Sequence, residues 1–195
     1  MSAQPGSYRE ILQKKIADLL NEFSEGKISG EQFNVLYERY MSQLSTLERA
    51  LLLNESDPVG AAQKSRSTSY IKSSLMGKPQ GISIYDRYTM QLIRTLGKFD
   101  VSERLVDDLL SQLSAAEDAE PVVEKIIEGQ WLLLAAGQYT AIATQFDHEP
   151  SARQAAHMKR LHSDFEEANR LFLHGREIDH EQMAFPFLSF IMGDE

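Results

Sequence analysis

The chain has 195 residues, of which 42% are hydrophobic, enough apolar material for one ordinary domain or a small domain with an appendage. It contains no cysteine, which excludes disulfides, thiolate metal sites and cysteine nucleophiles and is typical of a reducing compartment, so we expect a cytoplasmic protein. A net charge of -9 argues against general nucleic-acid binding, and we expect neither a signal peptide nor a membrane span of roughly 18 apolar residues.

Residues 7–53 are predicted to form an antiparallel helical hairpin. Ser7 and Glu10 have the spacing of a capping box, which predicts a first helix that begins near Tyr8 and ends at Gly26. Its apolar stripe consists of Leu12, Ile16, Leu19 and Phe23.

A second helix is predicted to begin directly after this turn. Ser29 and Gln32 repeat the capping pattern, and the apolar residues that follow alternate at spacings of four and three. This seam consists of Phe33, Tyr37, Tyr40, Leu44, Leu47 and Leu51. Because the connection between the helices is only about six residues long, the two helices must lie antiparallel.

The far end of the second helix is predicted to carry apolar surface, from Leu44 to Leu53, that the shorter first helix cannot cover. Two interpretations of what covers this surface remain open. Either the C-terminal domain of the same chain packs on it, or it binds a second copy of the chain or a partner helix. The candidate interaction residues of the hairpin are therefore Tyr40, Leu44, Leu47 and Leu51.

Residues 54–81 are predicted to form a linker, because prolines, glycines and serines replace the helical pattern. Basic residues from Lys64 to Lys78 have no acid among them. This composition leaves three interpretations open: a solvated tether, an anion contact, or a segment controlled by phosphorylation. A short apolar island, formed by Tyr70, Ile71, Leu75 and Met76, also leaves open a helical turn that packs against a neighbour.

Residues 82–99 fit either strands or a helix, and both interpretations stay open. Asp100 to Glu103 form another capping pattern, which predicts an amphipathic helix with Asp107 and Asp108 facing solvent. The predicted apolar face of this helix consists of Val101, Leu105, Leu109 and Leu113.

Three antiparallel strands are predicted next, over residues 122–129, 131–136 and 139–146, with a turn at Gly137. Trp131 opens the middle strand and is interpreted either as a core residue or as an exposed binding anchor. The chain is therefore predicted to have an α+β fold, in which the hairpin is followed by a small antiparallel sheet flanked by helices.

A covering helix is predicted to start near Pro150 and to end at Gly175. Its apolar face consists of Met158, Leu161, Phe165, Ala168 and Phe172. With this helix, the order of elements from about Ile82 to Leu173 is two possible strands, a helix, three strands and a helix.

This order resembles the roadblock/LC7 family of longin-like domains. The resemblance rests also on the strand, GQY turn and strand, and on the helix that starts at EPS and contains HSDFEEAN, and it covers about half of the chain. It implies that residues 82–195 form a non-enzymatic platform. Such a platform dimerises through a sheet edge or a helix, and it regulates or scaffolds small GTPases or motor-like assemblies.

No phosphate-binding, nucleophile-elbow or zincin motif occurs in the sequence. His162 and Glu166 lie four residues apart and would share a helix face as metal ligands, but we expect them to be solvent-facing helix residues. Glu166 and Glu167, near Asp164, are likewise interpreted as a solvated face instead of an acid/base cluster. We therefore assign no catalytic, cofactor-binding or metal-binding residue.

The aromatic run from Phe185 to Met192 is costly to expose to water and must dock on a surface. One interpretation is that the run docks within its own chain, on its own domain, with the N-terminal hairpin as one candidate surface. The other is insertion into a neighbouring subunit or partner as a short linear motif. The candidate interaction residues of this tail are Phe185, Phe187 and Phe190.

The leading functional hypothesis is a non-enzymatic protein–protein interaction module that acts as a dimeric adaptor or regulator associated with a small GTPase. A structural subunit that self-associates through the hairpin and the tail into a larger assembly is the alternative. An enzyme with an unusual carboxylate or histidine site is a third hypothesis. We expect the functional surfaces on the second helix, on a sheet edge near residues 137–144, and on the aromatic tail.

Overall fold

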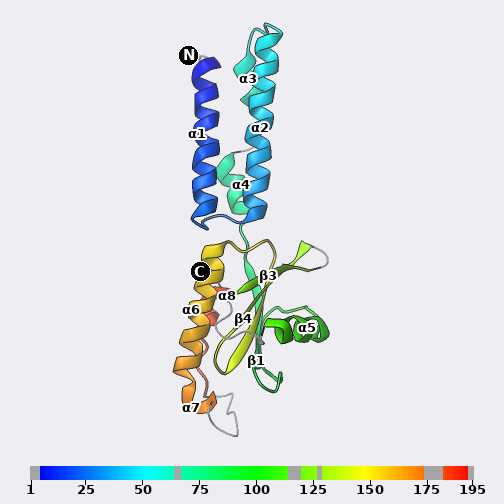
Figure 1. The fold of residues 1–195 in the computed structure, drawn as a ribbon, viewed down its shortest axis with the longest axis vertical. Helices are drawn as coiled ribbons and strands as arrows, with labels where there is room; N and C mark the ends of the chain where they lie inside the picture. Colours follow the sequence, from blue (N-terminus) through cyan, green and yellow to red (C-terminus); the bar gives the residue numbers. More distant parts are fainter. Residues whose placement is uncertain (1–4, 64–66, 114–119, 127–128, 174–181, 193–195) are drawn as a thin grey trace. The chain divides into compact units, whose positions relative to one another are not determined.

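A computed structural model describes residues 5–63, 67–113, 120–126, 129–173 and 182–192. The chain divides into two compact units, unit 1 from Met1 to Met76 and unit 2 from Gly77 to Glu195. Unit 1 is helical, and unit 2 contains a five-stranded antiparallel sheet flanked by helices (Figure 1). The predicted α+β fold class is confirmed.

Unit 1 is built on a helical hairpin. Its helices are α1 (Pro5–Ser24), α2 (Gly30–Leu52), α3 (Pro58–Gln63) and α4 (Thr68–Ser74). The capping box predicted at the start of α2 is confirmed, because Ser29 Oγ accepts from Gln32 N at 3.2 Å and Ser29 N donates to Gln32 Oε1 at 2.9 Å. Gly26 has a φ of 67°, a left-handed conformation that glycine adopts without strain, and it lies at the turn between α1 and α2.

The first helix begins earlier than its sequence pattern predicts. It starts at Pro5, so Ser7 lies inside the first turn and the capping box predicted for Ser7 and Glu10 is wrong. Proline is favoured at the first helical position because its φ is already helical and its missing N–H is not needed there. The preference for proline at this position therefore places the start of the helix before the capping pattern at Ser7.

The core of unit 1 lies between α1 and α2 and is joined by α3 and α4. Its buried residues are Tyr8, Leu12, Leu19, Ile28, Leu36, Tyr40, Leu47, Val59 and Ala62, with Ile71 packed against them. Leu36 is not part of the predicted seam, whereas Tyr37 and Leu51 of that seam are at least a third exposed. The buried stripe is displaced because α3 and α4 pack on one side of α2, where Tyr40 Oη lies 3.0 Å from Thr68 Oγ1.

Residues 54–81 contain more helix than a linker would, and the helical turn left open around Tyr70 and Ile71 is present as α4. The segment contains α3, α4 and the start of the first strand of unit 2. Its short polar residues act as helix caps: Asp57 Oδ1 accepts from Gly60 N at 2.9 Å, and Ser67 Oγ accepts from Tyr70 N at 3.2 Å. Helix α3 packs on the end of α2, so a helix of unit 1 itself covers part of that end.

The sheet of unit 2 has the strand order β2-β1-β5-β4-β3, and every pair is antiparallel. Its strands are β1 (Pro79–Asp86), β2 (Leu92–Gly97), β3 (Val122–Lys125), β4 (Trp131–Ala136) and β5 (Thr140–Phe146). Residues 82–99 thus belong to a β-hairpin, and the three strands predicted after them are present. The predicted sheet edge near residues 137–144 is wrong, because β1 pairs with β5 and leaves β2 and β3 at the edges.

Helices cover both faces of this sheet. Helices α6 (Ala152–Ala168) and α8 (Phe187–Met192) cover the face that carries Ile84 and Ile142, which are paired across β1 and β5. Helix α5 (Glu103–Leu113) covers the opposite face, to which Tyr85 and Ala141 belong. Successive strand residues point to opposite faces, so each strand contributes to both cores. Trp131 is half-buried against the α6 side, closer to the predicted core role than to an exposed anchor.

The buried face of α5 differs from the predicted one. Val106 and Leu110 are fully buried, whereas Leu105 is exposed. Leu113 of the predicted face is buried, and Val101 and Leu109 are half-buried against the same core, so the prediction is right in part. The helix begins only at Glu103, and its most buried residues follow the predicted Leu105 and Leu109 by one position. Asp107 and Asp108 are exposed, as predicted.

Helix α6 ends earlier than predicted and anchors the C-terminal tail. Asn169 caps it, and the short helix α7 (Arg170–Leu173) follows; the predicted end at Gly175 lies outside the described residues. The Asn169 amide donates to Phe165 O and to Ala184 O, and its carbonyl accepts from Ala184 N, each at 2.8 Å. The buried amide therefore pairs with the tail as a neighbouring strand would.

We expect Phe187→Ala to lower the free energy of unfolding of unit 2 by about 3–5 kcal/mol, because it empties a fully buried aromatic site in the α6 face of the core. Leu188→Ala is the matched control, since Leu188 is an exposed neighbour on the same helix and should change stability by less than about 0.5 kcal/mol. Urea unfolding followed by the fluorescence of Trp131, the single tryptophan, measures both variants. Equal effects would contradict this account of the tail.

Candidate functional site

The candidate interaction residues of the hairpin fall into two groups. Leu47 and Tyr40 are buried inside unit 1, so neither offers surface to a partner. Leu44 is half-buried and Leu51 is exposed. The seam predicted as one surface is therefore divided between the core of the hairpin and its outside.

The candidate residues of the tail dock on unit 2. Phe187 is fully buried, and Phe185 stacks on Phe165 with ring centroids 5.8 Å apart. Phe190 packs edge-on against Phe146 at 6.3 Å. The tail thus completes the core of its own domain, as one of its two interpretations expects.

An apolar surface remains on unit 1, and we name it the open helical face. It consists of Ile16, Leu20 and Phe23 of α1 and Phe33, Tyr37, Met41 and Leu44 of α2. Stacked rings join the two helices across it: the centroids of Phe23 and Phe33 are 4.8 Å apart, and those of Phe33 and Tyr37 are 5.6 Å apart.

Helical geometry places this surface on the side of the hairpin away from α4. Gln32 Nε2 donates to Lys72 O at 2.6 Å, and Lys72 Nζ pairs with Glu22, so these residues mark the side that α4 covers. At about 100° per residue, Met41 lies about 180° around α2 from Gln32. Leu20, by the same measure, lies about 160° around α1 from Glu22.

The open helical face is exposed and carries no charged side chain. Leu20, Phe23, Tyr37 and Met41 are between 36% and 48% exposed, and Ile16, Phe33 and Leu44 are half-buried. At the end of the hairpin where α1 begins, Arg9 and Glu48 form an ion pair at 3.2 Å. A contiguous apolar surface of this kind marks a contact with another macromolecule more often than chance exposure does.

A buried polar cluster lies inside unit 2, where Glu166 of α6 reaches the turn between β4 and β5. Its carboxylate accepts from Gln138 N at 2.8 Å, Tyr139 N at 2.8 Å and Thr140 N at 2.7 Å. Thr140 Oγ1 donates to it as well, at 2.8 Å. A Cβ at Gly137 would lie about 2.5 Å from this carboxylate, so glycine is required at that point of the turn.

His162 completes this cluster. Because Thr140 Oγ1 gives its only proton to Glu166, it must accept from His162 Nε2, which lies 2.8 Å away. Burial lowers the pKa of His162 to about 4, although the Glu166 carboxylate acts in the opposite direction. The imidazole is therefore neutral at pH 7 and carries its proton on Nε2.

This cluster is not arranged like an activated nucleophile. In a nucleophilic triad the histidine accepts the hydroxyl proton and the acid orients the histidine, whereas here the hydroxyl donates directly to the acid. Thr140 is also fully buried. The geometry fits a structural clamp on the turn.

The predicted solvent-facing position of His162 and Glu166 is wrong, since both are buried. Their sequence positions carry a signal for this: with Met158, Phe165 and Asn169 they share the spacing of three and four that marks one helix face. Among the described residues, no three His, Cys, Asp or Glu side chains are placed to hold a metal ion together.

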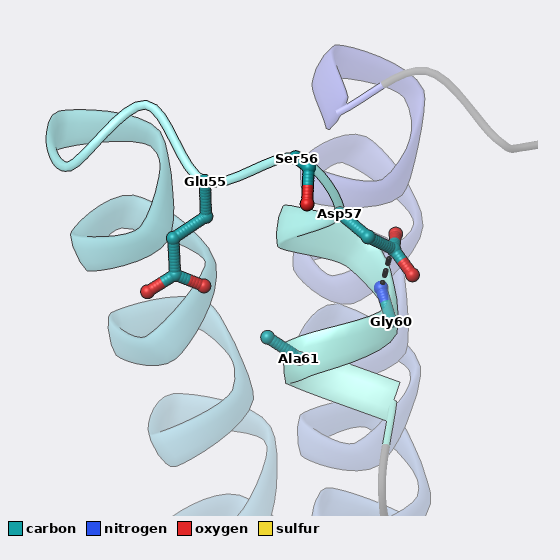
Figure 2. Close-up of a pocket in the computed structure, with 5 residues that line it drawn as sticks. All are labelled: Glu55, Ser56, Asp57, Gly60 and Ala61. Carbon is teal, nitrogen blue, oxygen red and sulfur yellow. Dashed lines mark hydrogen bonds between the residues drawn. The ribbon is translucent and has the colours of Figure 1, made fainter.

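A surface hollow of about 620 Å³ lies beside the start of α3, lined by Glu55, Ser56, Asp57, Gly60 and Ala61. Figure 2 shows the Asp57 carboxylate bonded to the backbone of Gly60, while the Glu55 carboxylate points in another direction. The Asp57 carboxylate is thus used as a helix cap, and the hollow has no converging ligand groups.

None of the helices in the described part of the chain has both the length and the apolar composition to cross a bilayer. Comparison with known proteins finds no family model, no curated protein and no solved structure that matches the chain.

We expect Glu166→Gln to destabilise unit 2 by about 2–4 kcal/mol, because the new NH2 group would face backbone donors in a buried site. Backbone amides of residues 138–140 should exchange with solvent faster in this variant. Glu167→Gln, an exposed neighbour on the same helix, is the matched control and should stay within about 0.5 kcal/mol of the parent. Similar losses of stability in both variants would show that the Glu166 clamp does not stabilise unit 2.

The lowered pKa of His162 predicts a loss of stability in mild acid. Between pH 6.5 and about 4 the unfolded chain binds a proton that the folded chain does not, so stability falls as the pH falls below 6.5. The slope from this group is at most about 1.4 kcal/mol per pH unit.

Urea unfolding of the His162→Gln variant across this range tests the pH dependence. Glutamine keeps a donor for Thr140 but does not titrate, so the slope should become shallower. An unchanged slope in the His162→Gln variant would refute the assignment.

Proposed function

We propose that the chain is a non-enzymatic protein–protein interaction module that acts in the cytoplasm as an adaptor or regulator associated with a small GTPase. The open helical face carries this proposal, because its exposed apolar side chains Leu20, Phe23, Tyr37 and Met41 form one surface free of charged groups. Aromatic and methionine side chains are enriched in protein contacts. The Glu166 carboxylate is buried and bonded to the backbone of a turn, which supports the non-enzymatic part of the proposal.

The small-GTPase partner is inferred from the roadblock/LC7 resemblance of unit 2. Its elements follow the order on which that resemblance rests: two strands, a helix, three strands and a helix. The compact sheet, rigidly tied to α6 by Glu166, supports a role as a platform that presents surfaces without moving.

A panel of purified small GTPases, each loaded with GDP or with a non-hydrolysable GTP analogue, tests the partner. Biolayer interferometry with the full chain should detect binding to at least one member, with a preference for one nucleotide state. Binding to no member in either state would count against the GTPase association.

A structural subunit of a larger assembly is the second candidate, and one observation favours it. Leu51, Leu52 and Leu53 form another exposed apolar patch at the end of α2, with Leu52 83% exposed. A chain with two separate apolar contacts can join two neighbours and grow without closing. A weight-average molar mass, measured by light scattering, that keeps rising as the concentration increases would support this candidate.

A further inference from the structure

We propose that the open helical face binds the same face of a second copy of this chain, so that two hairpins form a four-helix bundle. The proposal rests on the function proposed above and names the partner of that surface. Four features of unit 1 support it: the spacing of its apolar residues, its charge, the area that pairing would bury, and the stacked rings across α1 and α2.

The spacing of apolar residues on α2 points to a helical partner. Tyr40 and Leu47, seven residues apart, are buried inside the hairpin. Tyr37 and Leu44, also seven residues apart, lie on the open helical face. This second row continues the 3.5-residue repeat that packs helices against one another. Leu44 is partly buried against the core of unit 1, whereas Tyr37 is 36% exposed, so the outer side of the row is open.

The charge of the face favours a second copy over a partner selected by charge. The net charge of -9 lies outside unit 1, because residues 1–76 contain nine Lys and Arg and nine Asp and Glu. The open helical face itself has no ionised side chain, so two copies can meet there without like-charge repulsion. Both ends of the hairpin carry an acid beside a base, Arg9 with Glu48 at one end and Lys27 with Glu25 at the other. Either end of one copy can therefore lie beside either end of the other without a like-charge excess.

The apolar area is sufficient for a specific but modest contact. The four exposed and three half-buried side chains present on the order of 500 Å² per copy. Pairing two copies then buries roughly 1,000 Å², which is near the lower limit of specific interfaces. We therefore expect a dimer with a dissociation constant in the micromolar range and not a permanent one.

The stacked rings make the surface rigid before it binds. Phe23, Phe33 and Tyr37 hold one another in place across α1 and α2. Little side-chain freedom is left to lose when a second copy arrives, and this reduces the cost of association.

Sedimentation velocity of the full chain over a wide concentration range tests the dimer, with the Met41→Asp and Val35→Asp variants compared. Met41 and Val35 are both 41% exposed on α2 but lie about 120° apart around the helix, and only Met41 is on the open helical face. The parent and the Val35→Asp variant should shift with concentration toward twice the chain mass of 22.1 kDa. The Met41→Asp variant should stay monomeric, with its dissociation constant raised at least about 30-fold by a buried charge.

Circular dichroism of both variants shows whether each retains the helical content of the parent. Should the Met41→Asp variant lose helix, Met41→Gln replaces it as the milder probe, and a monomer is again expected. A parent that stays monomeric, or equal effects of the two substitutions, would overturn the proposal. A parent that grows beyond a dimer would also overturn it. GTPase binding by a monomeric parent would overturn only this inference and leave the proposed function standing.

Discussion

The Glu166 carboxylate fixes the geometry on which the rest of unit 2 depends. It reaches from α6 to the turn between β4 and β5 and satisfies three consecutive backbone amides there. Strand β5, which leaves this turn, is the central strand of the sheet and pairs with both β1 and β4. One side chain therefore sets the position of the helix over the sheet and the conformation of the central hairpin. Gly137 is part of the same constraint, because only a residue without a side chain leaves room for the carboxylate.

Polar side chains serve as local anchors at several other places in the chain. Asn169 joins the end of α6 to the tail, and Ser29 and Ser151 begin the two long helices that they precede. Each of these groups is satisfied by backbone partners, which a buried polar group needs in order not to destabilise the fold. Apolar side chains are thereby left to fill the cores, and the exposed apolar residues of α1 and α2 stand out as the exception.

The sequence predicts the helices and strands of this chain better than it predicts which elements pack or pair with one another. Capping at Ser29 and the strands around Gly137 depend on neighbouring residues, so local patterns are sufficient to find them. The place of β5 in the middle of the sheet depends on its pairing with β1, about 60 residues away, which no local pattern contains. The predicted sheet edge fails for this reason.

The candidate surfaces show the same limit. The 3.5-residue seam of α2 is visible in the sequence, but its division into buried and open rows follows from α3 and α4, which pack from a segment that resembles a linker. Likewise, His162 and Glu166 look like surface residues because charged side chains are seldom buried. Their burial follows from a turn, more than 20 residues earlier, whose amides require an acceptor.

The attachment of the tail through Asn169 and Phe187 has a consequence for the order of events during synthesis. Unit 1 is complete once residue 76 has been made, and its contacts join helices that are close in sequence. Unit 2 cannot close the α6 face of its sheet until residues near 187 have left the ribosome. The hairpin therefore has time to fold on the nascent chain while the sheet is still incomplete.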